Sequence, residues 1–271
     1  MRLTPRFPLL VLLVCLFVIT GLTFSSYLSL AAETTGADKL VAGVKGHEFV
    51  ANQTCIECHT AEAQAWQGSQ HDKAMQVANA ETVLGDFKDA SFTDAGVTSR
   101  FFQKDGKYFV NTAGEDGKLA DFEVKYTFGV KPLQQYLLAL PKGRLQAFTV
   151  AWDTQKNQWF DLYPNEKIPP ESPLYWTQRA FTANSSCIEC HTTNMSLKFD
   201  VQKREYHTTW NEANVSCQAC HGPGSQHVTW AKALTDKPTT QDKAGKTDNG
   251  LLVNYRQMDA KGVVETCAAC H

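Results

Sequence analysis

The stretch Cys217-Gln218-Ala219-Cys220-His221-Gly222-Pro223-Gly224-Ser225-Gln226-His227 contains the pattern Cys-x-x-Cys-His and, shortly after it, a second histidine. The pattern occurs three more times, at residues 55–59, 187–191 and 267–271. We number the motifs one to four in chain order, so the quoted stretch holds the third. In this pattern the two thiols bond to the vinyl groups of a haem and the histidine binds its iron. The sequence therefore predicts four covalently attached c-type haems.

The motifs define the candidate binding residues. We expect thioether bonds from the eight motif cysteines: Cys55, Cys58, Cys187, Cys190, Cys217, Cys220, Cys267 and Cys270. We expect iron ligands at the four motif histidines: His59, His191, His221 and His271. The ninth cysteine, Cys15, lies in an apolar N-terminal stretch, so none remains for a disulfide framework. Zinc bound by two Cys-x-x-Cys pairs is the alternative, but zinc does not require a histidine after every second cysteine.

The remaining histidines supply candidates for the second axial ligand. Outside the motifs there are four: His47, His71, His207 and His227. Four haems with two histidines each would use all eight histidines of the chain. Local pairing would join His71 to the first motif and His227 to the third, whereas exchange between motifs would pair them otherwise; the count gives the set and not the pairing. Rival ligands are Met75, Met195 and Met258, although methionine more often serves as packing material.

The N-terminus has the pattern of an export signal. Arg2 and Arg6 precede an apolar run over residues 7–22, followed by small residues that suit cleavage after Ala31. The run to residue 32 is also long enough for an uncleaved membrane anchor. We therefore expect a periplasmic or extracytoplasmic protein, with membrane association if the segment is retained.

Composition argues against nucleic acid as a partner. The chain has 26 Lys+Arg and 28 Asp+Glu, a formal net charge of −2. This balance of charges lacks the excess of basic residues that is typical of a nucleic-acid-binding protein. We expect redox proteins as partners, namely a quinol-oxidising or cytochrome donor and a reductase or outer-surface acceptor.

The chain divides into four segments by its motifs. After the signal at 1–31, a first haem segment covers 32–80, with a helix at 60–67 and a second beginning at His71. Residues 81–180 contain no cysteine or histidine, and residues 181–271 carry three motifs. Much of the apolar core should be porphyrin, so we expect the haem-free protein to be unfolded or protease-sensitive.

Residues 81–180 show the alternation of strands that bury one face. Candidate strands cover 99–103, 107–112, 119–128, 133–140, 145–152 and 157–163. Hairpin turns are expected at Lys104-Asp105-Gly106 and at Pro141-Lys142-Gly143-Arg144. The prediction is an antiparallel β-meander of five or six strands, inserted among short haem-nucleated helices and loops, and an α+β fold class.

Three stretches resemble a known family. Residues 55–75 (CIECHTAEAQAWQGSQHDKAM) resemble the opening haem motif of the cytochrome c554-type multihaem family. Residues 126–140 (YTFGVKPLQQYLLAL) with 144–153, and residues 207–227, resemble longer exported multihaem cytochromes with tetratricopeptide repeats. The resemblance implies a haem at Cys217, Cys220 and His221, distal ligands at His71, His207 and His227, and electron transfer as the role. Since those longer proteins continue into further motifs, it also implies a truncated member.

These observations favour one function over two others. The leading hypothesis is a tetrahaem cytochrome c that carries single electrons between respiratory partners. An alternative is an enzyme, a reductase or oxidase of a small nitrogen or sulfur compound, which requires one open iron; His47 is then the histidine most expected not to be a ligand. The third hypothesis is a filament-forming or adaptor cytochrome.

Overall fold

The computed structural model describes residues 46–236 and 249–271. The predicted signal peptide and Cys15 lie outside these residues. The chain divides into two units, Met1–Gly46 and His47–His271, and all described helices and strands belong to the second.

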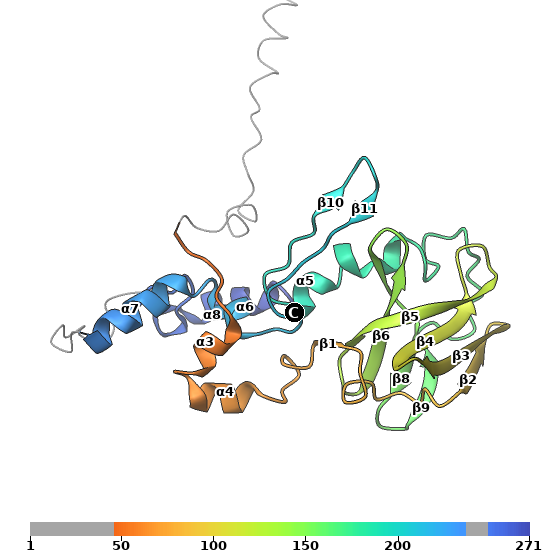
Figure 1. The fold of residues 1–271 in the computed structure, drawn as a ribbon, viewed down its shortest axis with the longest axis horizontal. Helices are drawn as coiled ribbons and strands as arrows, with labels where there is room; N and C mark the ends of the chain where they lie inside the picture. Colours follow the sequence, from red (N-terminus) through yellow and green to blue (C-terminus); the bar gives the residue numbers. More distant parts are fainter. Residues whose placement is uncertain (1–45, 237–248) are drawn as a thin grey trace, which may run out of the picture. The chain divides into compact units, whose positions relative to one another are not determined.

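A large antiparallel sheet is the main element of the described chain (Figure 1). Its nine strands are β1 (Met75–Val77), β2 (Ala90–Asp94), β3 (Val97–Lys104), β4 (Lys107–Ala113), β5 (Leu119–Phe128), β6 (Leu133–Leu140), β7 (Arg144–Ala147), β8 (Val150–Asp153) and β9 (Gln158–Asp161). The order is β2-β3-β4-β5-β6-β8-β9, with β1 paired to β5 and β7 paired to β6. Because neighbours in sequence are mostly neighbours in the sheet, local turns set most of its register.

The predicted strands are confirmed where alternation and turns are both present. Strands β5 and β6 have the predicted bounds. The turn between β3 and β4 is two residues long, Asp105 and Gly106, with φ of 52° and 73°. Two positive φ values are the mark of the hairpin turn whose twist matches that of its strands.

The prediction of one strand over 145–152 is wrong. The structure has two strands, β7 and β8, which pair with different parts of β6: Ala147 with Leu137, and Trp152 with Gln134. Ala147 and Phe148 are adjacent and both buried, at 4% and 2% exposure. Ala147 packs in the cluster around Leu137 and Phe148 in the aromatic core of the sheet, so the chain enters two different parts of the core where β7 ends.

The sheet is also larger than the five or six strands expected, because β1 and β2 were not predicted. The expected helix from His71 is absent; residues 70–74 form turns and β1 follows. In β1, Met75 lies opposite Phe128 and is 1% exposed. Burial against β5 therefore outweighs the local helical preference of the segment.

Aromatic side chains form the core of the sheet. Phe101 and Trp159 are stacked, with ring centroids 3.6 Å apart, and Phe87 meets both rings edge-on. Tyr136 is fully buried beside them and donates to Gln134 Oε1 at 2.9 Å. This core contains no cysteine or histidine, so the sheet can pack without a cofactor.

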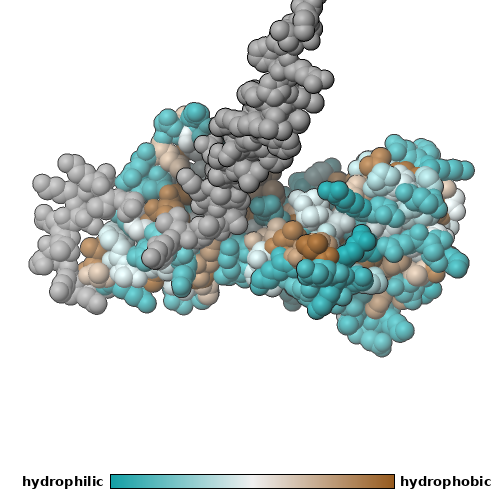
Figure 2. Space-filling model, turned by 90° about the horizontal axis from the view of Figure 1, so that it is seen from above, coloured by the Kyte–Doolittle hydropathy of each residue, from teal (hydrophilic) through white to brown (hydrophobic). Residues whose placement is uncertain are grey.

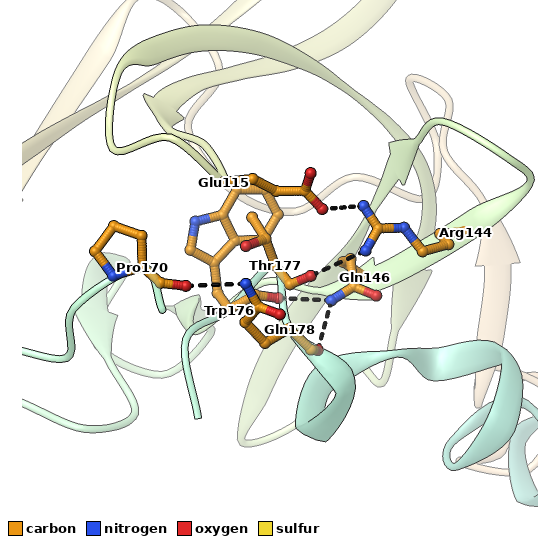
Figure 3. Close-up of polar contacts among 7 residues, drawn as sticks. All are labelled: Glu115, Arg144, Gln146, Pro170, Trp176, Thr177 and Gln178. Atoms are coloured by element: carbon orange, nitrogen blue, oxygen red, sulfur yellow. Dashed lines mark hydrogen bonds and ion pairs between the residues drawn. The ribbon is translucent and has the colours of Figure 1, made fainter. Parts of the chain in front are cut away.

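A polar network fastens the chain that leaves the sheet (Figure 3). Its members are Glu115, Arg144, Gln146, Pro170, Trp176, Thr177 and Gln178. Arg144 donates to the Glu115 carboxylate and to the Thr177 carbonyl, the latter at 3.3 Å. Gln146 Nε2 donates to the carbonyls of Trp176 and Gln178 at 2.8 and 2.9 Å. The segment that leads to the second motif is thus held against β7.

Short helices carry the motifs. They are α3 (Asn52–Ile56), α4 (Thr60–Trp66), α5 (Ile188–His191), α6 (Cys217–His221), α7 (Ser225–Asp236) and α8 (Ala260–Ala268); a small hairpin, β10 (Phe199–Asp200) and β11 (Glu205–Tyr206), lies between α5 and α6. Helix α4 confirms the helix expected at 60–67. No helix among the described residues is long and apolar enough to cross a membrane.

Candidate haem-binding site

Each motif is one helical turn. In the first motif the His59 amide donates to the Cys55 carbonyl at 2.9 Å, and in the fourth the His271 amide donates to the Cys267 carbonyl at 3.0 Å. A single turn brings the first cysteine and the histidine, four residues apart, to one face of the chain. The third motif is helix α6, which ends at Gly222 with φ of 75°. The left-handed conformation there suits glycine and turns the chain toward α7.

The motifs lie beside one another in a definite order. The Cys55 thiol of the first motif donates a hydrogen bond to the Cys217 sulfur of the third. This contact raises the pKa of Cys55 and lowers that of Cys217 to about 7. Burial, and then a hydrogen bond to the sulfur of Cys190 in the second motif, raise the pKa of Cys270 to about 11.

The third and fourth motifs are also neighbours. Burial raises the pKa of Cys220, and the nearby Cys267 of the fourth motif raises it further. Tyr255 lies between these motifs: its hydroxyl donates to the Cys220 carbonyl at 3.4 Å, and its ring meets that of His221 edge-on at 5.1 Å. The four motifs therefore follow one another in the order first, third, fourth, second.

Two motif histidines face a histidine from elsewhere in the chain. The rings of His59 and His227 lie 6.0 Å apart between centroids, with an interplanar angle of 26°. The rings of His71 and His271 lie 5.9 Å apart, at 67°. An imidazole nitrogen binds a transition metal at about 2 Å, so two rings on opposite sides of one ion have centroids roughly 6 Å apart. The centroid separations of both pairs match this spacing.

Backbone carbonyls orient three of the rings. Nδ1 of His191 lies 2.8 Å from the Ala74 carbonyl, that of His221 lies 3.3 Å from Val253, and that of His227 lies 2.8 Å from Asn249. A carbonyl accepts only, so Nδ1 must carry the proton. The lone pair is then on Nε2, the arrangement of a metal-ligating histidine.

The other two candidate ligands have different surroundings. His47 has a buried Nδ1 with no hydrogen-bond partner among the described residues. The next residues of its segment contact the third motif region, since Val50 donates to Gln218 Oε1 at 3.0 Å. His207 follows β11, its side chain is 59% exposed, and Nε2 lies 3.9 Å from Glu205. No described ring contact joins His191 or His221 to a second histidine.

The space around the motifs suits a large apolar group. Beyond Ile188, no Val, Leu, Ile, Met, Phe, Tyr or Trp side chain of the described chain is buried. Leu252 is 42% and Val264 is 65% exposed, and Figure 2 shows hydrophobic patches at the surface among hydrophilic ones. Helix α8 has no buried residue at all. A segment that presents apolar side chains without burying them has the surface that a porphyrin would cover.

A bare metal ion would need a different donor set. No group of three or more His, Cys, Asp or Glu side chains among the described residues is arranged to hold one. Iron in a porphyrin needs only two protein ligands, as the two ring pairs provide. Of the rival ligands, Met75 and Met195 lie in the apolar cluster around Phe128 and Leu137, where they act as packing.

Sequence reasoning missed several groups that shape the site. The ring of Phe128 is stacked on His191 at 4.3 Å and 17°. The carbonyls of Ala74, Val253 and Asn249 leave no mark in the sequence because every residue has a carbonyl. Phe128 lies inside the stretch quoted for the resemblance, but only the fold shows that it meets a motif histidine.

Comparison with known proteins gives a partial family match. The model of the family described as cytochrome c554 and c-prime matches residues 54–100 and 150–222, which is less than half of the chain. The matched ranges contain the first three motifs and not the fourth. No curated protein sequence matches the chain.

Two solved structures are similar. One is the outer cell wall cytochrome OcwA, at 19% identity and a TM-score of 0.45, covering 82% of this chain and 37% of that one. The other is the undecahaem cytochrome from the S-layer of Carboxydothermus ferrireducens, at 16% identity and a TM-score of 0.40, covering 67% and 22%. This chain thus spans well under half the length of either.

The motifs and the family match together define the class. The chain is a multihaem c-type cytochrome, similar over the matched residues to the cytochrome c554 and c-prime family. Cytochromes of this kind bind haem covalently, transfer electrons to and from redox proteins and are typically extracytoplasmic.

Proposed function

We propose that the protein is an extracytoplasmic tetrahaem electron carrier with two histidine ligands on each iron. Haem supplies one-electron chemistry, and the protein fixes the position, ligands and surroundings of each iron. The eight motif cysteines would hold the four haems. Residues 1–31 would direct export or anchor the chain, a first haem segment would cover 32–80, and the sheet segment 81–180 would separate it from three haem sites at 181–271 in an α+β fold.

The observation that carries this proposal is that two motif histidines each face a second histidine. His227 would be the second ligand of the first-motif iron, opposite His59, and His71 that of the fourth-motif iron, opposite His271. Each pair joins segments remote in sequence, so neither contact follows from local chain geometry. Bis-histidine ligation leaves the iron no open position, which favours a carrier over an enzyme.

The sulfur contacts support a linear order of sites. The first motif adjoins the third through Cys55 and Cys217, the third adjoins the fourth near Cys220 and Cys267, and the fourth adjoins the second through Cys270 and Cys190. The first and second motifs would then be the two ends. Redox partners would dock at those ends, a donor at one and an acceptor at the other.

His47 and His207 complete the proposed ligand set. His47 has the buried, unpartnered Nδ1 and belongs to a segment that contacts α6, so the third-motif iron is its natural target. That assignment leaves His207 for the second-motif iron. Because His207 is exposed, its assignment to the second-motif iron is the weakest of the four. A second-motif iron without a second ligand would favour the alternative function, a reductase or oxidase.

The test is electron paramagnetic resonance with a pyridine haemochrome count on the oxidised protein. Four low-spin haems are expected, and His227→Ala and His71→Ala should each turn one of them high-spin. Thr229→Ala, on the exposed side of α7, is the matched control for His227 and should change nothing. A high-spin haem in the unaltered protein would support the enzyme instead, and four low-spin haems in both histidine variants would refute the pairing.

A further inference from the structure

Two residues just before the third motif hold the turn that carries His71. The Val215 amide donates to the His71 carbonyl at 3.1 Å. The Val215 carbonyl accepts from the indole nitrogen of Trp66 at 2.9 Å. The side chain of Asn214 donates from Nδ2 to Asp72 Oδ1 at 3.0 Å, across 142 residues of sequence. Residues 214 and 215 are therefore hydrogen-bonded to three residues in and before the turn: Trp66, His71 and Asp72.

Asp72 connects Asn214 to the backbone of the turn by further hydrogen bonds. Its second oxygen, Oδ2, accepts from the Gly68 amide at 2.8 Å, and its own amide donates to Ser69 Oγ at 3.2 Å. Gly68 has φ of 75°, a conformation in which glycine is favoured. A carboxylate that accepts two N–H donors fixes the distance between them, here between residue 68 of the turn and residue 214 of the other segment.

Among the described residues, the bond to Asp72 is the side-chain hydrogen bond that Asn214 makes. Its Oδ1 is buried without a hydrogen-bond partner among the described residues. Burying an amide oxygen unpaired is unfavourable, so the amide is held here for what Nδ2 does. The neighbouring Asn211 differs, since its exposed Oδ1 accepts from Asn194 at 2.7 Å and touches no part of the turn.

We propose that Trp66, Asp72, Asn214 and Val215 form a clamp that presents His71 to the fourth-motif iron. The inference rests on the proposed pairing of His71 with His271. These are positioning residues: none is a ligand, and each acts through His71. The clamp makes ligation at the fourth motif depend on residues that flank the third.

The decisive variant is Asn214→Leu, which keeps the volume and deletes the amide. The Asp72 carboxylate then loses a donor, and the population with His71 detached should rise about tenfold, the factor that one charge-assisted hydrogen bond supplies. The readouts are the high-spin fraction and the rate at which added cyanide binds one haem. Both should increase for Asn214→Leu and stay unchanged for Asn211→Leu.

The exchanged pair Asp72→Asn with Asn214→Asp supplies a rescue. It restores one amide and one carboxylate across the contact, so it should return the cyanide rate toward that of the unaltered protein while Asp72→Asn alone does not. If Asn214→Leu fails to fold, Trp66→Phe removes only the indole donor and should show the same gain.

The two hypotheses fail in different ways. If His71→Ala creates a high-spin haem but Asn214→Leu and Trp66→Phe leave the spin state and cyanide rate unchanged, the clamp is wrong and the pairing stands. If His71→Ala leaves every haem low-spin, the pairing itself is wrong.

Discussion

The carbonyl oxygen of Ala74 lies 2.8 Å from Nδ1 of His191 and also accepts the Gly129 amide at 3.1 Å. His71, which faces His271, lies only three residues earlier in the same turn. One turn therefore touches the candidate ligands of two motifs and the end of the sheet. Substitutions at this end of the sheet should therefore alter the surroundings of the second and fourth motifs more than those of the first and third.

Phe128→Leu tests the contact between the sheet and the second motif. The stacked ring is 6% exposed, so its loss should lower the free energy of unfolding by about 1–2 kcal/mol. It should also shift the reduction potential of one haem, measured by spectroelectrochemical titration. Phe102→Leu removes a stacked ring that faces Phe109 instead, and should cost stability without moving a potential. Equal effects on potential would contradict the contact.

Gly143→Ala tests how the β10–β11 hairpin is seated. Gly143 has φ of 68°, and a methyl group there would collide with the Tyr206 carbonyl. Gly106 has φ of 73° but open space around it, so Gly106→Ala carries only the backbone cost of about 1 kcal/mol. We expect Gly143→Ala to lower the free energy of unfolding by a further 1–3 kcal/mol or so in denaturant titrations. Indistinguishable midpoints for the two variants would exclude the close approach.

Two carboxylates should respond to pH with opposite sign. Burial, with Asp94 and Glu166 nearby, raises the pKa of Asp161. The unfolded group ionises near 3.9, so its stabilisation is present below that pH and is lost as pH rises through the folded pKa. Asp161→Asn should therefore increase stability at pH 7, by less than about 1 kcal/mol because the group is half-exposed, and make no difference at pH 3.

Glu123 is the matched opposite. A hydrogen bond from Lys125, reinforced by Lys107, lowers the pKa of Glu123. Its contribution is present above the unfolded pKa of about 4.3 and is lost as pH falls through the folded value. Glu123→Gln should lower stability slightly at pH 7 and not at pH 3. Thermal unfolding of both variants at pH 7 and pH 3 measures these stability changes. If Asp161→Asn and Glu123→Gln changed stability at pH 7 in the same direction, the assigned pKa shifts would be contradicted.

The haem-free protein should be folded in one part only. Among residues 46–236 and 249–271, the buried large aliphatic and aromatic side chains end at Ile188, and the sheet core uses none of the motifs. With all eight motif cysteines changed to alanine, hydrogen exchange should remain slow in β3 to β9 and become fast in α6 and α8. The haem-loaded protein is the control. Slow exchange throughout the haem-free chain would show that the motif segments fold without their cofactor.

The sheet could be predicted largely from local signals. Strand β5 alternates apolar and polar residues over 122–128, and both β5 and β6 are bounded by glycine and proline turns, so their limits follow from the sequence. β1 could not be found this way, because three residues carry no periodicity and its partner β5 lies some fifty residues further along. The break between β7 and β8 depends on Phe148 entering the core, which only the packing reveals.

The sequence supplies the candidate ligands as a set and not as an arrangement. Four motifs and four further histidines give the number of candidate ligands. Proximity in sequence would have placed His71 with the first motif and His227 with the third, whereas the structure turns them toward the fourth and the first. Long-range contacts such as that between Asn52 and Glu212 decide this, and no local pattern records them.

The contacts that close the first motif region span 142 to 177 residues. Bringing such distant segments together costs chain entropy and slows folding. The folded sheet reduces that cost: one apolar cluster contains Met75 of β1, its first strand, and Ile188, which follows its last strand, so the sheet holds both flanking segments at a single place. The hundred residues without a cofactor site thus bring the two motif regions close together once the sheet has folded. Destabilising the sheet should therefore slow the formation of the haem sites more than it changes their final structure.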